Sequence, residues 1–178
     1  IESSLIDFSE ETASESMAPG GGSISAYAGV LGVSLGTMVA NLSAHKRGWD
    51  DRWDEFSQWV EKGQIIRQEL LDLVDEDTRS FNRIMEAYGL PKTSDEEKEA
   101  RKRAIQEATK YAMEVPFKVM EKGLEAMQVC LAMAKSGNPN SISDAGVGAL
   151  CARTAIRGAF MNVKVNGMDL EDKLFVED

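Results

Sequence analysis

Residues 23–44 carry no charged side chain, and this stretch most limits what the chain can fold into. Its length is sufficient for a helix that crosses a membrane. However, it contains six polar residues and three glycines, which add little apolar surface: Ser23, Ser25, Ser34, Thr37, Asn41 and Ser43, with Gly29, Gly32 and Gly36. A helix without charges must still be buried in something. The composition therefore predicts a helix in a protein core and no association with a membrane.

Two stripes of side chains run along this predicted helix. Small residues recur every four positions at Ala28, Gly32, Gly36 and Ala40. Bulkier residues recur at three- and four-residue spacing at Leu31, Leu35, Met38 and Leu42. Because small residues let helices approach closely, we expect this helix at the centre of a bundle or across a subunit interface.

The rest of the chain predicts further helices. Apolar residues keep a helical period in residues 2–17, 49–88, 95–136, 141–165 and 169–178. Ser23 is the expected cap of the uncharged helix, Thr93 and Ser94 precede a helix start, and Asn166 with Gly167 are expected to end a helix. No segment shows a sustained period of two. We therefore predict one all-α domain over residues 1–178, a multihelical bundle of long antiparallel helices with essentially no β-sheet.

Charge and cysteine content exclude several classes of function. The chain has 20 basic and 30 acidic residues, a net charge of −10, which disfavours general binding to nucleic acid or to anionic membranes. Cys130, Cys151 and a single histidine do not suggest a metal site or a disulfide framework. Glu2 and Asp7 stand where a signal peptide needs basic and apolar residues, so we expect a cytoplasmic protein.

Gly20, Gly21, Gly22 and Ser23 precede the uncharged helix. Glycines let a ligand approach the backbone, and free N–H groups at a helix start bind negative or carbonyl oxygens. The alternative is a tight turn between helices. The spacing to a Lys-Ser/Thr pair that a P-loop requires is missing.

A few charged and amide side chains are candidates for a site. Lys46, Arg47 and Arg157 could bind carboxylates, or they are solvated surface charges. Asp77 faces partly toward the apolar side of its helix, where a carboxylate can act as general acid or base, and Asp144 also fits a first-turn acid that complements the helix dipole. Asn162 could bind an amide-rich heterocycle or cap a helix end.

The segment Ala18-Pro19-Gly20-Gly21-Gly22-Ser23, with its Ala/Gly-rich continuation, resembles the signature of the cyclodeaminase domain of formiminotransferase-cyclodeaminase and of methenyltetrahydrofolate cyclohydrolases. Further matching segments follow in order: Leu73-Val74-Asp75 with Asp77, Leu90-Pro91-Lys92, Gly137-Asn138, Ser143-Asp144, and Gly158-Ala159-Phe160 with Asn162. Relatives continue through a C-terminal helix, so we expect that helix to be truncated here. His45 stands where relatives often carry glycine, and no family role is carried onto it.

The resemblance implies an all-α homodimer that acts on tetrahydrofolate without a metal. The expected reaction is the cyclodeaminase step, from 5-formiminotetrahydrofolate to 5,10-methenyltetrahydrofolate and ammonia; a cyclohydrolase is the alternative. A histidine-degradation context and a formiminotransferase partner would go with the cyclodeaminase. A non-catalytic folate-binding or dimerisation module is the alternative of another class.

On this hypothesis the residues divide by role. Asp77 and Asp144 supply the carboxylates that shuttle protons. The substrate-binding residues hold the pterin, the one-carbon group and the polyglutamate tail of the folate: Gly20, Gly21, Gly22, Ser23, Lys46, Arg47, Arg157 and Asn162.

Overall fold

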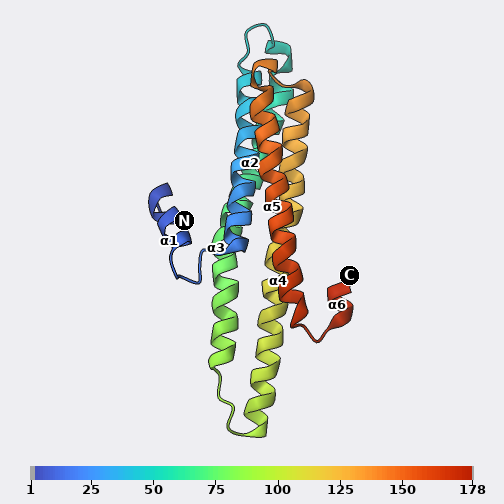
Figure 1. Ribbon diagram of the computed structural model, residues 1–178. Coiled ribbons are helices and arrows are strands. Elements are labelled where there is room, and N and C mark those ends of the chain that lie inside the picture. The colour runs from blue at the N-terminus through green and yellow to red at the C-terminus, as the bar shows by residue number, and fades with distance from the viewer. Residues whose placement is uncertain (1–2, 178) are drawn as a thin grey trace.

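The computed structural model describes residues 3–177, and within that range all regular structure is helical (Figure 1). The α-helices are α1 (Leu5–Ala13), α2 (Gly21–Ala44), α3 (Trp53–Gly89), α4 (Asp95–Ser136), α5 (Ile142–Met168) and α6 (Lys173–Glu177). Two short 3-10 helices, η1 (Asp50–Arg52) and η2 (Pro139–Ser141), precede α3 and α5. The predicted all-α bundle is confirmed.

Three of the predicted helix boundaries need correction. The first helix is shorter than residues 2–17, and it begins after Ser4, whose Oγ accepts a hydrogen bond from the Asp7 N–H at 3.1 Å. Helix α2 begins at Gly21 rather than after Ser23, with Gly20 as its N-cap and no side-chain hydrogen bond from that residue.

Helix α5 is longer than predicted, because it continues through Asn166 and Gly167 to Met168. The Asn166 Nδ2 donates to the Ala112 carbonyl at 2.6 Å, and Gly167 packs closely against Met113 of α4. These contacts with a distant helix hold the last turn, although both residues are weak helix formers.

Helix α2 occupies the centre of the bundle, packed against α3, α4 and α5. A Cβ on Gly32 would lie 2.8 Å from the Gly148 carbonyl oxygen, so the backbones of α2 and α5 approach closely there. A Cβ on Gly36 would lie 3.1 Å from Val129 on α4. The expected role of the small-residue stripe in close packing is confirmed.

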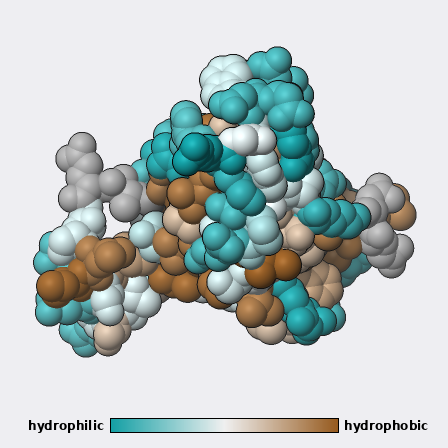
Figure 2. All heavy atoms as spheres, turned by 90° about the horizontal axis from the view of Figure 1, so that it is seen from above, coloured by the Kyte–Doolittle hydropathy of each residue, from teal (hydrophilic) through white to brown (hydrophobic). Residues whose placement is uncertain are grey.

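One face of α2 is nevertheless not covered. Among residues 3–177, α2 is the one helix long and apolar enough to cross a membrane, and 61% of its apolar window is buried inside the bundle. The bulky stripe accounts for much of the rest: Ile24, Leu31, Met38 and Leu42 are 37–46% exposed. Seen from above, polar side chains cover much of the near end of the molecule, and apolar side chains gather along its flanks (Figure 2).

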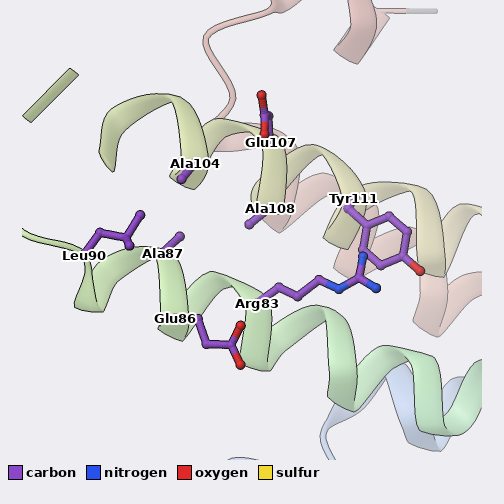
Figure 3. Close-up of a pocket in the computed structure, with 8 residues that line it drawn as sticks. All are labelled: Arg83, Glu86, Ala87, Leu90, Ala104, Glu107, Ala108 and Tyr111. Atoms are coloured by element: carbon purple, nitrogen blue, oxygen red, sulfur yellow. The ribbon is translucent and has the colours of Figure 1, made fainter. Parts of the chain in front are cut away.

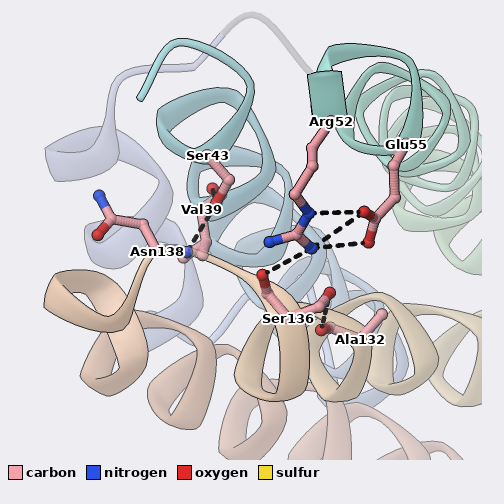
Figure 4. A network of polar contacts seen from close by, with 7 residues as sticks. All are labelled: Val39, Ser43, Arg52, Glu55, Ala132, Ser136 and Asn138. Atoms are coloured by element: carbon pink, nitrogen blue, oxygen red, sulfur yellow. Dashed lines mark hydrogen bonds and ion pairs between the residues drawn. The ribbon is translucent and has the colours of Figure 1, made fainter. Parts of the chain in front are cut away.

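The C-terminal end of α2 is closed by a polar network (Figure 4). The Arg52 side chain donates to both Glu55 carboxylate oxygens and to the Ser136 carbonyl at 3.0–3.1 Å. The buried Ser43 Oγ accepts a hydrogen bond from the Asn138 N–H at 2.8 Å. The loops that join α2 to α3 and α4 to α5 are thereby fixed to the helix ends.

Helices α3 and α4 are longer than α2 and α5, and their far ends extend as a two-helix hairpin beyond the start of α2 (Figure 1). The N-terminus of α2 therefore lies partway along α3, opposite a continuous helix rather than at the tip of the bundle. This arrangement brings α3 side chains to the start of α2.

Candidate active site

The N-terminus of α2 receives a carboxylate from α3. The Asp77 Oδ2 accepts hydrogen bonds from the Ser23 N–H and the Ser23 Oγ, both at 2.8 Å. The first N–H groups of a helix have no partner within the helix, and their partial positive charge favours an acid. Asp77, 54 residues along the chain, thus performs the capping that Gly20 cannot.

Glycine at position 22 is required by this contact. A Cβ built on Gly22 would lie 2.0 Å from the Asp77 Oδ1, far inside van der Waals contact. Gly21 has more room, since its Cβ would lie 3.6 Å from the Asn162 Nδ2 on α5. The glycines therefore let side chains from two other helices reach the start of α2.

A cavity of about 140 Å³ lies at this helix start. It is lined from the α1–α2 connection and from all four long helices: Met17, Ala18, Gly20, Gly21, Gly22, Asp77, Thr78, Ser80, Phe81, Ile84, Ala112, Asn162 and Asn166. Asp77 is the one acidic or basic side chain among these residues. The cavity thus combines a single carboxylate with amide, hydroxyl and apolar groups.

The amide of Asn162 is partly engaged in α5 itself. Its Nδ2 donates to the Gly158 carbonyl at 2.9 Å, whereas its Oδ1 has no hydrogen-bond donor among residues 3–177. That oxygen remains able to accept a hydrogen bond from a molecule in the cavity.

Several lining residues were missed by the sequence analysis. Thr78, Ser80 and Ile84 follow Asp77 on α3, and Met17 and Ala18 precede the glycines. Ser80 and Ile84 lie three and seven residues after Asp77, on the same helix face. That spacing is the signal that would have identified them once Asp77 had been chosen.

Ser23, expected to contact substrate, is fully buried and is not among the residues that line the cavity. Its hydroxyl is directed to Asp77 instead. The structure therefore does not support a direct substrate contact by this side chain.

Three other candidate residues lie at the opposite end of α2. Lys46 and Arg47 follow its C-terminus, and the Lys46 Nζ stacks 3.9 Å from the centre of the Trp49 ring. Asp144, in the first turn of α5, precedes Ala145, which packs in the apolar cluster with Ala44. At 1.5 Å per residue, the two ends of α2 are about 35 Å apart. Within one chain, Asp77 and Asp144 are therefore not brought together.

Arg157 lies between these two ends, exposed on α5 one turn before Met161, and it makes no ion pair with residues 3–177. It is five residues from Asn162 and so points away from the Asn162 face. The structure leaves this guanidinium on the outer surface of the bundle.

A wider cleft of about 420 Å³ lies farther along the α3–α4 hairpin (Figure 3). There Arg83 reaches across from α3, and its guanidinium lies 4.3 Å from the centre of the Tyr111 ring on α4. The Tyr111 hydroxyl donates to Glu76, and this hydrogen bond lowers the pKa of Glu76 and raises the pKa of Tyr111. Arg79 beside Glu76 lowers the pKa of that carboxyl further. These groups satisfy one another and hold α3 to α4, so we place the site at the smaller cavity with Asp77.

The sequence matches known proteins over nearly its whole length. The family model described as formiminotransferase-cyclodeaminase matches residues 4–178. A methenyltetrahydrofolate cyclohydrolase from Methylorubrum extorquens is 39% identical over 171 residues, covering 96% of this chain and 82% of that protein. The mouse formimidoyltransferase-cyclodeaminase is 33% identical over 177 residues, covering 99% of this chain but only 33% of that protein.

The fold is also similar to that of a solved structure. The crystal structure of formiminotetrahydrofolate cyclodeaminase from Thermotoga maritima superimposes with a TM-score of 0.88 at 28% identity, covering 99% of this chain and 84% of that one. Sequence and structure agree over nearly the whole length of the chain. The chain therefore belongs to the formiminotransferase-cyclodeaminase family.

Proposed function

We propose that this chain is a tetrahydrofolate one-carbon enzyme in which Asp77 transfers the protons. The reaction is the conversion of 5-formiminotetrahydrofolate to 5,10-methenyltetrahydrofolate and ammonia. The observation that carries the proposal is the Asp77 carboxylate, held on the N-terminus of α2 as the one charged group lining the cavity. The names of relatives, cyclodeaminases and a cyclohydrolase of folate, support the substrate class.

One carboxylate can serve both proton transfers of this reaction. The formimino group enters protonated, as an amidinium. N10 of the folate attacks its carbon, and Asp77 accepts the proton that N10 loses. Asp77 then returns that proton to the amino nitrogen, which leaves as ammonia when its bond to the carbon breaks. The proton count closes on Asp77, and the positive charge remains on the methenyl product, beside the carboxylate.

The size of the cavity fits only the reacting part of a folate. Ligand pockets commonly enclose about 300–1,000 Å³, whereas this cavity holds about 140 Å³. The one-carbon group and the adjoining ring nitrogens would enter it, where the Asn162 Oδ1 can accept a hydrogen bond. The aminobenzoyl and glutamate portions would lie outside, on the surface of the bundle.

A cyclohydrolase is the second candidate, favoured by the 39% identity to the Methylorubrum extorquens enzyme. In this reaction water adds to the methenyl carbon, and Asp77 accepts its proton. Asp77 then returns that proton to N5 as the bond from the carbon to N5 breaks. The remaining hydroxyl proton of the adduct is lost to solvent as its C–O bond becomes the carbonyl of 10-formyltetrahydrofolate. Both reactions use the same carboxylate. They differ in the nucleophile, N10 or water, and in the leaving group, ammonia or N5, that the cavity accommodates.

A homodimer is the assembly that the exposed stripe supports. On α2, Ile24, Leu31, Met38 and Leu42 lie on one face, and together with Ala28 and Leu35 they keep a four-three heptad spacing. Neighbouring α5 also exposes apolar side chains at heptad positions: Val147, Leu150, Met161 and Met168. A second copy of this chain is the partner whose surface repeats the same pattern.

An antiparallel pairing suits this stripe best. A two-fold axis between Leu31 and Leu35 would set Ile24 against the partner's Leu42, so the face is complementary to itself. It would also bring the partner's Lys46, Arg47 and Asp144 beside the glycine-rich start of α2. The partner's Lys46 and Arg47 would then bind the polyglutamate tail across the interface, and the partner's Asp144 would supply the second carboxylate expected from the sequence. Arg157 lies on the same outer surface.

A formiminotransferase is the proposed supplier of the formimino substrate, in histidine degradation. Relatives such as the mouse protein carry a formimidoyltransferase in their name, and this chain covers 33% of their length.

The test is an assay of 5-formimino- and 5,10-methenyltetrahydrofolate side by side, followed by methenyl absorbance and ammonia release. Asp77→Asn keeps the size of the side chain and removes its proton-accepting charge, so we expect a rate loss of about 10²–10⁴-fold. Asp72→Asn, an exposed acid on the same helix, is the matched control and should retain its rate.

Each outcome separates the candidates. Ammonia release with formiminotetrahydrofolate identifies a cyclodeaminase, and loss of methenyl absorbance without it identifies a cyclohydrolase. Folate binding without turnover would show a non-catalytic module. Full activity of folded Asp77→Asn would refute the role of Asp77.

A further inference from the structure

The two oxygens of Asp77 have different surroundings. Oδ2 accepts two hydrogen bonds at 2.8 Å, from the Ser23 N–H and the Ser23 Oγ. Ser23 is 0% exposed, so water cannot replace its hydroxyl as a donor. Two donors satisfy the lone pairs of a carboxylate oxygen. Oδ2 is therefore committed to α2.

Oδ1 is the oxygen left available. No residue in the described range donates a hydrogen bond to it, and Asp77 lines the cavity. The nearest obstacle would be a side chain at position 22, whose Cβ would lie 2.0 Å from Oδ1 and 2.6 Å from the carboxylate carbon. Because residue 22 is glycine, Oδ1 occupies that space.

We infer that Ser23 and Gly22 are positioning residues that select Oδ1 of Asp77 as the oxygen that transfers protons. This inference rests on the proposed function of Asp77. Ser23 holds one oxygen, which fixes the rotation of the carboxylate, and Gly22 leaves the other oxygen in its place. Ser23 lies outside the cavity lining, and Gly22, which lines the cavity, acts by leaving room for the carboxylate. The glycine-rich segment therefore acts partly through a side chain from another helix.

Orientation of this kind has a large effect on rate. A proton-transferring group that is free to rotate spends most of its time away from the reacting atom, and a displacement of about 1 Å can cost about 10²-fold. Two bonds to one oxygen remove that freedom before the substrate arrives. The rate, rather than the binding of folate, should therefore depend on residues 22 and 23.

The first experiment replaces each residue beside a matched control. Gly22→Ala should lower kcat about 100-fold with KM within about twofold, because its methyl must displace the carboxylate. Gly89→Ala, on the helix that carries Asp77, has open space at its Cβ and should keep its rate. Ser23→Ala should lower kcat about tenfold, since it removes one of the two donors. Ser25→Ala removes a nearby buried hydroxyl bonded to the Gly21 carbonyl at 2.6 Å and should keep its rate.

The second experiment repeats Gly22→Ala and Ser23→Ala in the Asp77→Asn background under single-turnover conditions. If the two residues act through Asp77, each should now lower the residual rate by less than about twofold. Thermal unfolding of every variant checks that the fold is intact. A cost that is as large in the Asp77→Asn background as in the wild type would mean a purely structural effect and would overturn the inference.

The result also separates this inference from the proposed function. Full activity of Asp77→Asn refutes the proposed function itself. An inactive Asp77→Asn together with active Gly22→Ala and Ser23→Ala refutes only the positioning role.

Discussion

The two ends of α2 are built in opposite ways. At its C-terminus, side chains close the helix end among themselves: Ser43 binds the Asn138 N–H, Arg52 binds Glu55 and the Ser136 carbonyl, and the Trp49 and Phe56 rings stack at 5.7 Å. At its N-terminus, Gly20 provides no side-chain cap, and the helix takes a carboxylate from α3 beside a cavity.

This difference indicates what each end does. The closed end holds connecting loops in place: Arg52 pairs with Glu55, and Lys46 and Arg52 stack on the Trp49 ring. The open end leaves a carboxylate oxygen and an amide oxygen without hydrogen-bond donors from residues 3–177. Both residues line the cavity, where a ligand can supply the donors.

The largest expected effect tests whether the N-terminal end of α2 in one chain meets the C-terminal end of α2 in the other chain of a dimer. Asp77→Asn and Asp144→Asn chains should each retain about 1% activity or less. Mixed in equal amounts after reversible unfolding, half of the dimers contain one chain of each kind, and one of their two sites is intact. About a quarter of the wild-type activity should therefore return. A site made within one chain predicts no recovery, as does a control mixture of Asp77→Asn with a chain carrying both substitutions.

The next effect concerns the basic residues of the closed end. If Lys46 and Arg47 receive the carboxylates of the tail, Lys46→Ala and Arg47→Ala should each raise KM for a triglutamated folate about tenfold. The kcat should stay within about twofold, and the change should shrink with a monoglutamate. Lys135→Ala, an exposed lysine in the last turn of α4, is the control. An unchanged KM for both variants would mean that Lys46 and Arg47 do not bind the glutamate tail, which would then lie only near the N-terminus of α2.

A smaller effect on stability should appear at the closed end. Arg52→Ala removes the hydrogen bonds to Glu55 and Ser136 and the stacking of the guanidinium 4.5 Å from the Phe56 ring. We expect a loss of about 1–2 kcal/mol and a Tm lower by about 5 °C, measured by calorimetry. Arg103→Ala, an exposed arginine without an ion pair to residues 3–177, should not change the Tm. Equal Tm values for both variants would show that the closed end is not stabilised by this network.

The smallest effect is a pH dependence of stability at Glu76, the residue before Asp77 on α3. The Tyr111 hydroxyl lowers the pKa of Glu76 in the folded protein. Such a carboxylate stabilises the fold above its unfolded pKa, and that contribution is lost as the pH falls through the lowered value. Tyr111→Phe should therefore cost about 1 kcal/mol near neutral pH and less below about pH 4 in urea unfolding.

The control for this last measurement is Tyr88→Phe, on the same helix as Glu76 with an exposed ring. It should not change the free energy of unfolding at either pH. A loss for Tyr111→Phe that is independent of pH would assign its effect to packing rather than to Glu76.

Local signals in the sequence explain the predictions that were confirmed. Ser94 accepts a hydrogen bond from the Glu97 N–H, and the Glu97 side chain accepts from the Ser94 N–H, the reciprocal cap expected from caps followed by acids. The stripe at Gly32 and Gly36 likewise predicted close helix packing from its spacing alone. Patterns of this kind depend on residues within one or two turns of each other.

The predictions that needed correction depend on contacts with distant residues. Ser23 was predicted to cap α2, but the helix begins three residues earlier, with Gly20 as its N-cap, and Asp77 of α3 binds its first turn. Asn166 and Gly167 were predicted to end α5, but contacts with Ala112 and Met113 extend it. The assignment of Asp77 and Asp144 to one site is not corrected in this way. The two residues lie near opposite ends of α2 within one chain, so the assignment depends on a second chain and stays a prediction.

The sequence by itself determined that this chain is a helical bundle around an uncharged central helix, and it identified the glycine-rich segment and Asp77 as candidates. Helical period, caps and small-residue spacing are local, so they can be read without coordinates. Only the tertiary structure decided that Gly22 and Ser23 act on Asp77 and that Lys46, Arg47 and Asp144 lie at the other end of α2. Those facts depend on where a 37-residue helix places one side chain against another helix, which no local pattern encodes.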